Sequence, residues 1–486
     1  MSSVKQLFSQ SFVYGLSTVL PKLLNFFLVF IHTRVLVDPV QYGIVSELYA
    51  YITFLLILLT FGLETGFFRF VNKNEDKSKV YSTVFYFLLL TSALASFLFV
   101  GFSDSISSSL GTVYDPLYIS TLGIVISLDA FMALPFAKLR SENRPILFST
   151  IKILGVVINI VLNLFFFVFL TPDQLQSLIP HVNILYFIFL SNLIQNVLTV
   201  LVLLYFTHLP KFDFDYSLLK KILKYSLPLL LAGLTGTTNE AFDRIFLKYL
   251  LPQESNPLYQ LGIYGANYKL AVLLMLFIQM YRFAAEPFFF NLQGSKNSLE
   301  VYGKALKYFI VFCLIIFLFI TFNLPLFKYY VGSEYRQSLF IVPILLIANI
   351  LNGTFFNLSF WYKLSDKTLY GVKYTAVGAT LTIVSNILLI PILGIYGAAL
   401  ARVICYLVMN ILSYRDGRFS GYISLDKSHL KKYIILFITI FIIATILFFT
   451  KPIFAVVFIN ISLLYFVYEF IKTEHIQIPY INRFIR

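Results

Sequence analysis

Four cationic side chains that fall inside long apolar runs are candidate functional residues: Lys22, Lys152, Lys269 and Arg402. A charge at membrane depth is costly unless it has a partner or lines a water-filled cavity. A lysine ammonium can hold a phosphate-type anion as a point charge. We therefore interpret these residues as candidate cavity cations, with Lys22 the strongest because it lies near the middle of its run. The alternative for each is a structural ion pair, or a side chain that reaches the membrane surface.

Three acidic residues inside apolar runs are candidates for gating or ion coupling: Glu47, Asp129 and Glu240. Glu47 and Lys269 lie 222 positions apart, at equivalent places of an internal repeat described below. We hypothesise that they pair across a cavity in one state and separate in another. Asp129 is a candidate for proton or sodium coupling, with a polar contact between helices as the alternative. Glu240 either lines a cavity or balances Arg244 one helical turn later.

Other charged residues fall near the expected membrane edges, where we predict that they anchor loops to helix ends. They are Arg34, Glu64, Asp243, Arg244 and Glu286.

The composition indicates an integral membrane protein. The 486 residues are 59% hydrophobic and 12% charged, whereas soluble domains are about 45–50% apolar and about 25% charged. The two cysteines, Cys313 and Cys405, are isolated in apolar runs, and the five histidines lack metal-ligand spacing. We therefore expect no metal, no cofactor and no catalytic residues.

The apolar runs predict an all-α fold with fourteen transmembrane helices, because a spanning helix needs about 20 mostly apolar residues. Lipid requires every backbone polar group to be paired within the segment, which excludes irregular spans. The predicted spans are 11–33, 43–63, 80–101, 117–138, 146–170, 183–206, 225–247, 261–282, 305–326, 338–360, 371–393, 396–414, 433–449 and 452–470.

The distribution of Lys and Arg supports this topology. With the N-terminus in the cytoplasm, the inner segments hold 26 of these residues and the outer segments hold 6. Such an excess follows the positive-inside rule and predicts that both termini are cytoplasmic. The net charge of +14 therefore reflects topology, and nucleic acid is not an expected partner.

An internal repeat divides the chain. At a shift of 222, Glu64 falls on Glu286, and the segment 153–170 falls on 376–393 at a shift of 223. Six predicted spans separate the copies, so both copies cross the membrane in the same direction, as in parallel repeats. We predict a six-helix lobe over 1–210, a second over 211–420, and two additional helices with a short cytoplasmic tail over 421–486. A binding site is expected between the lobes.

Three segments carry a resemblance to a known family. They are YGLSTVLPKLLNFFLVFIHTRVLVDPVQYG (14–43) with GLETGFF after it, YSLPLLLAGLTGTTNEAFDRIFLKYLL (225–251) and SNILLIPILGIYGAALA (385–401). This pattern resembles the multidrug/oligosaccharidyl-lipid/polysaccharide (MOP) exporter superfamily, in particular its branch of polysaccharide-biosynthesis (O-antigen and capsule repeat-unit) flippases. The resemblance covers nearly the whole chain.

The resemblance implies two six-helix lobes around a central cavity in the bacterial cytoplasmic membrane. It implies transfer of polyprenyl-pyrophosphate-linked oligosaccharides between leaflets by alternating access, with Lys22 meeting the pyrophosphate. Polysaccharide polymerases and glycosyltransferases are the expected partners.

Two alternatives within the superfamily remain open, a drug/cation antiporter and a peptidoglycan-precursor flippase. A membrane polymerase or glycosyltransferase is disfavoured, because no large outer loop carries a pair of acids suited to glycosyl transfer.

Overall fold

The computed structural model describes residues 2–73, 76–180, 182–292, 298–419 and 427–475, and these residues form helices and their connections. The predicted boundary at 421 and the tail from 476 lie outside the described residues. The long helices are α1 (Ser2–Val35), α2 (Pro39–Thr60), α4 (Lys77–Gly101), α6 (Pro116–Ser141), α7 (Pro145–Leu164, continued by a π-helix to Phe169), α9 (Tyr186–Thr207), α10 (Tyr216–Leu250), α11 (Pro257–Leu292), α12 (Ser298–Phe322), α14 (Ile341–Leu358), α16 (Leu369–Leu393), α17 (Ile395–Phe419), α18 (Lys427–Thr450) and α19 (Pro452–Thr473).

Within the described residues, twelve helices are long and apolar enough to cross a membrane. They correspond to twelve of the predicted spans, while α1 and α10 cover the first and the seventh. In α10 the polar residues from Thr235 to Glu240, followed by Asp243 and Arg244, interrupt the apolar run. The chain is thus an all-helical, multi-pass membrane protein.

Asp and Pro residues define where several of these helices begin. Asp38 caps α2 by accepting a hydrogen bond from the backbone nitrogen of Val40, and Asp115 caps α6 in the same way. A proline follows each cap, at the position where its missing N–H costs nothing. Asp215 caps α10, and hydrogen bonds from the Leu218 backbone, Ser217 and Lys79 hold the pKa of its carboxyl well below the usual value.

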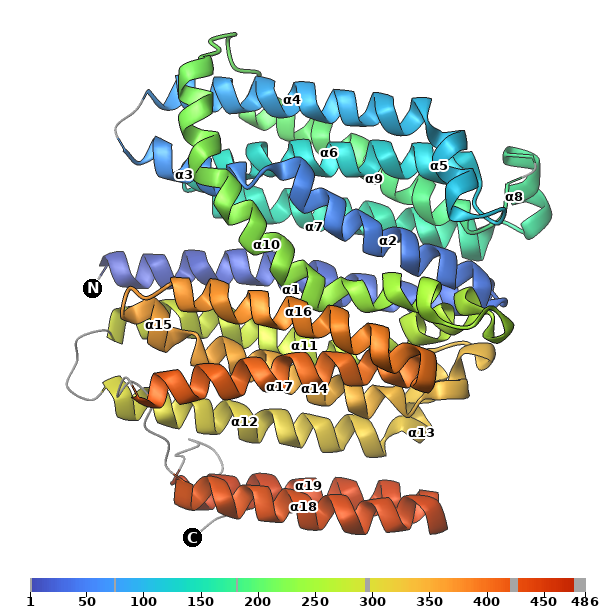
Figure 1. Ribbon diagram of the computed structural model, residues 1–486, viewed down its shortest axis with the longest axis vertical. Coiled ribbons are helices and arrows are strands. Elements are labelled where there is room, and N and C mark those ends of the chain that lie inside the picture. The colour runs from blue at the N-terminus through green and yellow to red at the C-terminus, as the bar shows by residue number, and fades with distance from the viewer. Residues whose placement is uncertain (1, 74–75, 181, 293–297, 420–426, 476–486) are drawn as a thin grey trace.

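The helices from the first part of the chain gather in one group, and α11, α12, α14, α16 and α17 form another, with α1 between them and α10 crossing from one group to the other (Figure 1). Helix α1 begins and α19 ends at the same end of the molecule (Figure 1). Following the distribution of charge, we name this the inner end and the opposite one the outer end. The short helices α3 (Leu63–Val71) and α15 (Phe360–Leu364) lie at the inner end, and α5 (Ser103–Leu110) and α8 (Pro172–Leu178) lie at the outer end.

Helices α18 and α19 attach to the second group through α12. Tyr433 and Phe466 belong to the same apolar core as residues of α12 and α14. At the inner end, Glu474 pairs with the buried Lys307 at 2.7 Å. Burial opposes ionisation of Glu474, but hydrogen bonds from Lys307, Tyr308 and Tyr433 outweigh it and lower the pKa of the carboxyl. Breaking such a buried pair is costly, so this contact fixes the helix pair to α12.

The two halves repeat one ion pair at the inner end. Glu64 pairs with Arg140, and Glu286 pairs with Lys363 at 3.0 Å. The shift is 222 for the acids and 223 for the cations. Three residues after each cation, Asn143 and Asp366 both adopt a positive φ, 53° and 57°. A backbone conformation that L-residues rarely adopt therefore recurs at equivalent positions, which supports the internal repeat.

Candidate functional site

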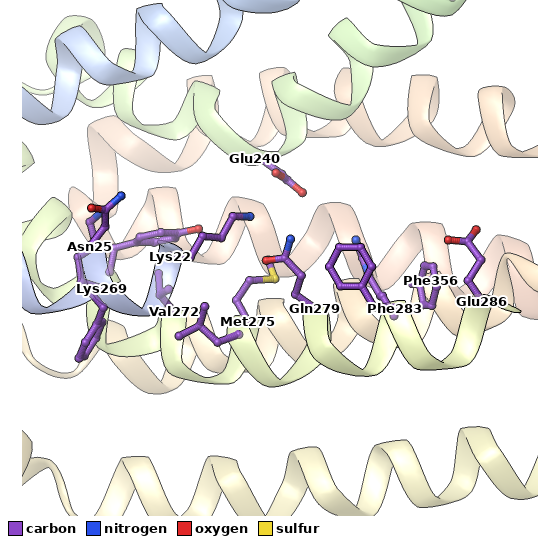
Figure 2. Close-up of a pocket in the computed structure, with 14 residues that line it drawn as sticks. Lys22, Asn25, Glu240, Lys269, Val272, Met275, Gln279, Phe283, Glu286 and Phe356 are labelled. Carbon is purple, nitrogen blue, oxygen red and sulfur yellow. The ribbon is translucent and has the colours of Figure 1, made fainter. Parts of the chain in front are cut away.

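A cavity of about 630 Å³ lies where α1 and α10 meet the second group of helices, and α1, α10, α11 and α14 form its walls (Figure 2). Its lining residues are Lys22, Asn25, Phe26, Glu240, Tyr268, Lys269, Val272, Met275, Leu276, Gln279, Arg282, Phe283, Glu286 and Phe356. Helix α11 contributes most of them at steps of three and four residues, so they form one face of the helix. Because this face runs from Tyr268 to Glu286, the cavity extends towards the inner end.

The charged side chains of the cavity are predominantly cationic. Lys22 projects from α1, and Lys269 and Arg282 project from α11. Of the two lining acids, Glu286 is paired with Lys363 at 3.0 Å. Glu240 reaches in from α10, on the side opposite the α11 residues (Figure 2). With Glu286 paired, three cations and one carboxylate remain among the lining residues that the structure describes, so the cavity favours an anionic group.

Arg282 is a cavity cation that the sequence analysis did not select. Its Nη2 donates to Asn352 Oδ1 at 3.1 Å, and its guanidinium lies over the Phe356 ring at 4.7 Å. These two contacts with α14 fix the guanidinium at the wall. The available signal was a cation inside an apolar run, at four residues before Glu286 on the same helix.

Arg402 lies outside the cavity lining, in a buried cluster between α10, α11 and α17. Its Nε lies 3.5 Å from Asp243 Oδ2, and its Nη2 donates to the backbone carbonyl of Glu240. Tyr264 donates its hydroxyl to the same Asp243 carboxylate at 2.6 Å. The guanidinium therefore holds α10 in place. Asp243, which was expected at the membrane edge, is buried in this cluster.

Lys152 also lies off the lining of the cavity. It is half-buried on α7, with its ammonium 4.8 Å from the Phe148 ring centre and 5.3 Å from that of Phe136. Cation–π contacts of this kind stabilise a desolvated ammonium. Its role as a cavity cation stays a prediction, although Lys152 lies within electrostatic range of the lining residue Lys22.

Glu47 forms an ion pair that links the halves, but its partner in this structure is Lys248. The carboxylate is fully buried on α2, 2.8 Å from Lys248 of α10, and it accepts a hydrogen bond from Tyr114. Helix α10 packs along α2, and its last turn brings Lys248 to this position. Lys269, the partner hypothesised from the sequence, faces the cavity.

Asp129 makes a polar contact between helices. It lies on α6 and accepts a hydrogen bond from Asn196 Nδ2 of α9 at 3.0 Å. A separate buried network joins α1, α7 and α9. The His32 ring and the Asn163 side chain share a hydrogen bond of 2.7 Å, and Asn159 Nδ2 donates to Asn192 Oδ1 at 3.0 Å. This network could not be predicted from the sequence, because scattered asparagines in apolar runs give no spacing signal.

Arg34 and Arg244 stabilise the outer part of the molecule. Arg34 donates to the backbone carbonyls of Tyr329 at 2.6 Å and Tyr330 at 3.3 Å. Arg244 lies over the Tyr268 ring at 4.5 Å. The Arg34 contacts join α1 to the segment before α14. The loop-anchoring role expected for the edge charges stays a prediction.

Close backbone contacts between α2 and α11 lie at the outer end, and we interpret them as the closure of the cavity on that side. A Cβ on Gly43 of α2 would lie 2.0 Å from the carbonyl oxygen of Leu258, and a Cβ on Gly262 of α11 would lie 1.9 Å from that of Pro39. Both distances are too short for any other residue, so glycine is what allows α2 and α11 to touch.

The loop before α14 adds a second seal, which we name the outer latch (residues 329–335 against 26–36). The Gly332 backbone nitrogen donates to Thr33 Oγ1 at 3.0 Å, and Tyr335 donates its hydroxyl to the Leu36 carbonyl at 2.5 Å. Tyr330 stacks on Phe26 with ring centres 4.2 Å apart.

No metal site is evident in the described part of the chain, where no group of three His, Cys, Asp or Glu side chains could hold an ion.

Residues 7–293, more than half of the chain, match the family described as polysaccharide biosynthesis protein. The chain belongs to this family. No curated protein sequence matches it.

Solved structures show the same fold. The lipid II flippase MurJ in an inward closed conformation has a TM-score of 0.75, with 12% identity over 95% of this chain and 99% of that chain. An inward-facing multidrug resistance MATE family transporter of the MOP superfamily has a TM-score of 0.67, with 18% identity over 85% and 96%. A MOP superfamily transporter from Pyrococcus furiosus, for which reversed polarity of the binding pocket suggests a different function, has a TM-score of 0.57, with 16% identity over 86% and 95%. This polysaccharide biosynthesis protein is therefore a multi-pass membrane protein with the fold of MOP superfamily transporters.

Proposed function

We propose that this protein moves polyprenyl-pyrophosphate-linked oligosaccharides across the bacterial cytoplasmic membrane, without catalysing a reaction. The observation that carries the proposal is a cavity lined by Lys22, Lys269 and Arg282, in which Lys22 and Arg282 lie within electrostatic range of each other. A pyrophosphate headgroup needs several cations in a water-accessible space, and lysine and arginine both bind phosphate oxygens well. Membership of the polysaccharide biosynthesis family supports an oligosaccharide as the rest of the cargo.

In the proposed mechanism, two six-helix lobes in a fourteen-helix protein alternate the access of the cavity. The contacts at Gly43, Gly262 and the outer latch hold the outer end closed. The headgroup enters from the inner end, and separation of the outer contacts then exposes it to the other side. Both termini are cytoplasmic in this arrangement, and the polymerase and glycosyltransferases of the same polysaccharide are the proposed partners.

A peptidoglycan-precursor flippase is the second candidate, because its cargo carries the same pyrophosphate and the fold of MurJ matches. A drug/cation antiporter fits less well, since three cations would repel a cationic ligand.

Reconstitution tests the proposal. Purified protein in liposomes is offered a fluorescent polyprenyl-pyrophosphate oligosaccharide, a lipid II-type precursor or a cationic dye, and exposure on the opposite leaflet is measured. We expect protein-dependent transfer of the oligosaccharide lipid. Transfer of the precursor alone would establish the second candidate, and transfer of the dye alone would overturn the proposal.

Lys22→Gln is expected to reduce transfer by at least about tenfold, which corresponds to roughly 1.4 kcal/mol of lost interaction with the headgroup. Lys304→Gln removes the same charge from an exposed pair with Glu300 and should transfer at the wild-type rate. Lys152→Gln tests the candidate off the lining, and we expect a smaller loss than for Lys22→Gln. Equal transfer by Lys22→Gln and wild type would exclude Lys22 from the binding site.

A further inference from the structure

Glu240 is an acidic residue in a cavity otherwise suited to anions, and its position is tightly fixed. Its backbone carbonyl accepts a hydrogen bond from Arg402, which also pairs with Asp243 one turn later. Because this buried cluster holds the α10 backbone from behind, the Glu240 side chain projects into the cavity (Figure 2).

The Glu240 carboxylate acts on two of the cavity cations. Lys22 on α1 and Arg282 on α11 both lie within electrostatic range of it. The other lining acid, Glu286, has its own cation in Lys363. Glu240 is therefore the lining carboxylate that acts on both Lys22 and Arg282, while Glu286 acts more weakly on Arg282 alone.

We propose that Glu240 is a resident counter-anion that competes with the ligand's phosphates for Lys22 and Arg282. This inference rests on the proposed function and adds a determinant of affinity and release to the same site. When the cavity is empty, Glu240 offsets the mutual repulsion of Lys22 and Arg282. When a pyrophosphate enters, it must displace Glu240, so binding is weaker than the cations alone would allow.

This competition makes release possible. A ligand held by Lys22 and Arg282 without a competing anion would bind tightly and leave slowly, and tight ground-state binding does not increase turnover. With Glu240 present, the carboxylate returns to the cations as the phosphates leave. Glu240 therefore lowers affinity in exchange for faster turnover.

The test separates affinity from turnover in Glu240→Gln. Binding of inorganic pyrophosphate and of polyprenyl pyrophosphate in mixed micelles is measured by calorimetry at fixed ionic strength, and transfer is measured in liposomes. We expect Glu240→Gln to bind both probes about tenfold more tightly, equivalent to about 1.4 kcal/mol, and to transfer the lipid more slowly at saturating substrate. A structural role alone would not tighten binding.

Three variants complete the design. Glu300→Gln removes an acidic charge from the exposed pair with Lys304 and should leave affinity unchanged, which excludes an effect of net charge. Glu240→Asp keeps the carboxylate and should bind more like wild type. In a Lys22→Gln background, Glu240→Gln should gain less affinity, because one of the cations for which it competes is gone.

The outcomes distinguish this inference from the proposed function. If wild type transfers the lipid while Glu240→Gln binds pyrophosphate no more tightly, the inference is overturned and the proposed function stands. If Glu240→Gln tightens pyrophosphate binding but no lipid is transferred by wild type, the counter-anion role stands and the proposed function fails.

Discussion

Arg402→Met is expected to lower the free energy of unfolding by about 3–5 kcal/mol, because it leaves the Asp243 carboxylate buried without its cation. Arg402 and Asp243 are both almost fully buried and join α17 to α10. The variant also loses the hydrogen bond from Arg402 to the Glu240 carbonyl. The measurement is unfolding of purified protein by SDS in mixed micelles, followed by tyrosine fluorescence and by helix content.

The double variant Arg402→Met with Asp243→Leu is the matched control. It removes both charges, so most of the lost stability should return, and the two substitutions should be strongly non-additive. An Arg402→Met protein as stable as wild type would contradict the structural role. If the double variant regains stability but does not transfer lipid, Arg402 acts on the substrate, as the sequence analysis predicted.

Gly262→Ala is expected to open the outer end of the cavity. The added Cβ would lie 1.9 Å from the Pro39 carbonyl oxygen, so α2 and α11 must move apart. Overpacking of this kind typically costs about 1–3 kcal/mol, a difference that shifts a two-state equilibrium by roughly 5- to 150-fold. We measure it by placing a cysteine at Gln279 in the cavity, with Cys313 and Cys405 replaced by serine, and labelling with an impermeant thiol reagent from outside. Labelling should be faster than in the parent.

Gly236→Ala provides the control for Gly262→Ala. Gly236 is also a glycine of a cavity-forming helix, but nothing lies within 4 Å of the Cβ that it would gain. Labelling in this variant should equal that of the parent. Equal labelling of Gly262→Ala and Gly236→Ala would show that the α2–α11 contact does not hold the outer end closed.

The positions of the helices could be predicted because they depend on local sequence. An apolar run of membrane length is helical whatever surrounds it, and caps such as Asp38 and Asp115 define where helices begin. The equivalence of Glu64 and Glu286 also followed from the sequence, and the structure gives both residues the same type of partner. The short helices α3, α5 and α8 were not predicted, because they are too short to give a periodic signal.

The partners of the buried charges could not be predicted. The sequence shows that Glu47 and Arg402 need a partner at membrane depth, but several opposite charges were available to each. Lys248 and Asp243 are the partners because α10 passes α2 and α17 at particular heights, and that depends on packing over the whole bundle. Arg282 was overlooked for a related reason, since its role depends on which face of α11 is turned to the cavity.

The outer latch has a consequence for variation on the exposed surface. In each of its hydrogen bonds, one partner is a backbone group: the carbonyls of Tyr329, Tyr330 and Leu36, and the nitrogen of Gly332. A backbone carbonyl is present whatever side chain its residue carries. Tyr329 can therefore change without loss of the hydrogen bond to Arg34. The exposed side chains of this loop can therefore vary while the backbone contacts that join it to α1 remain.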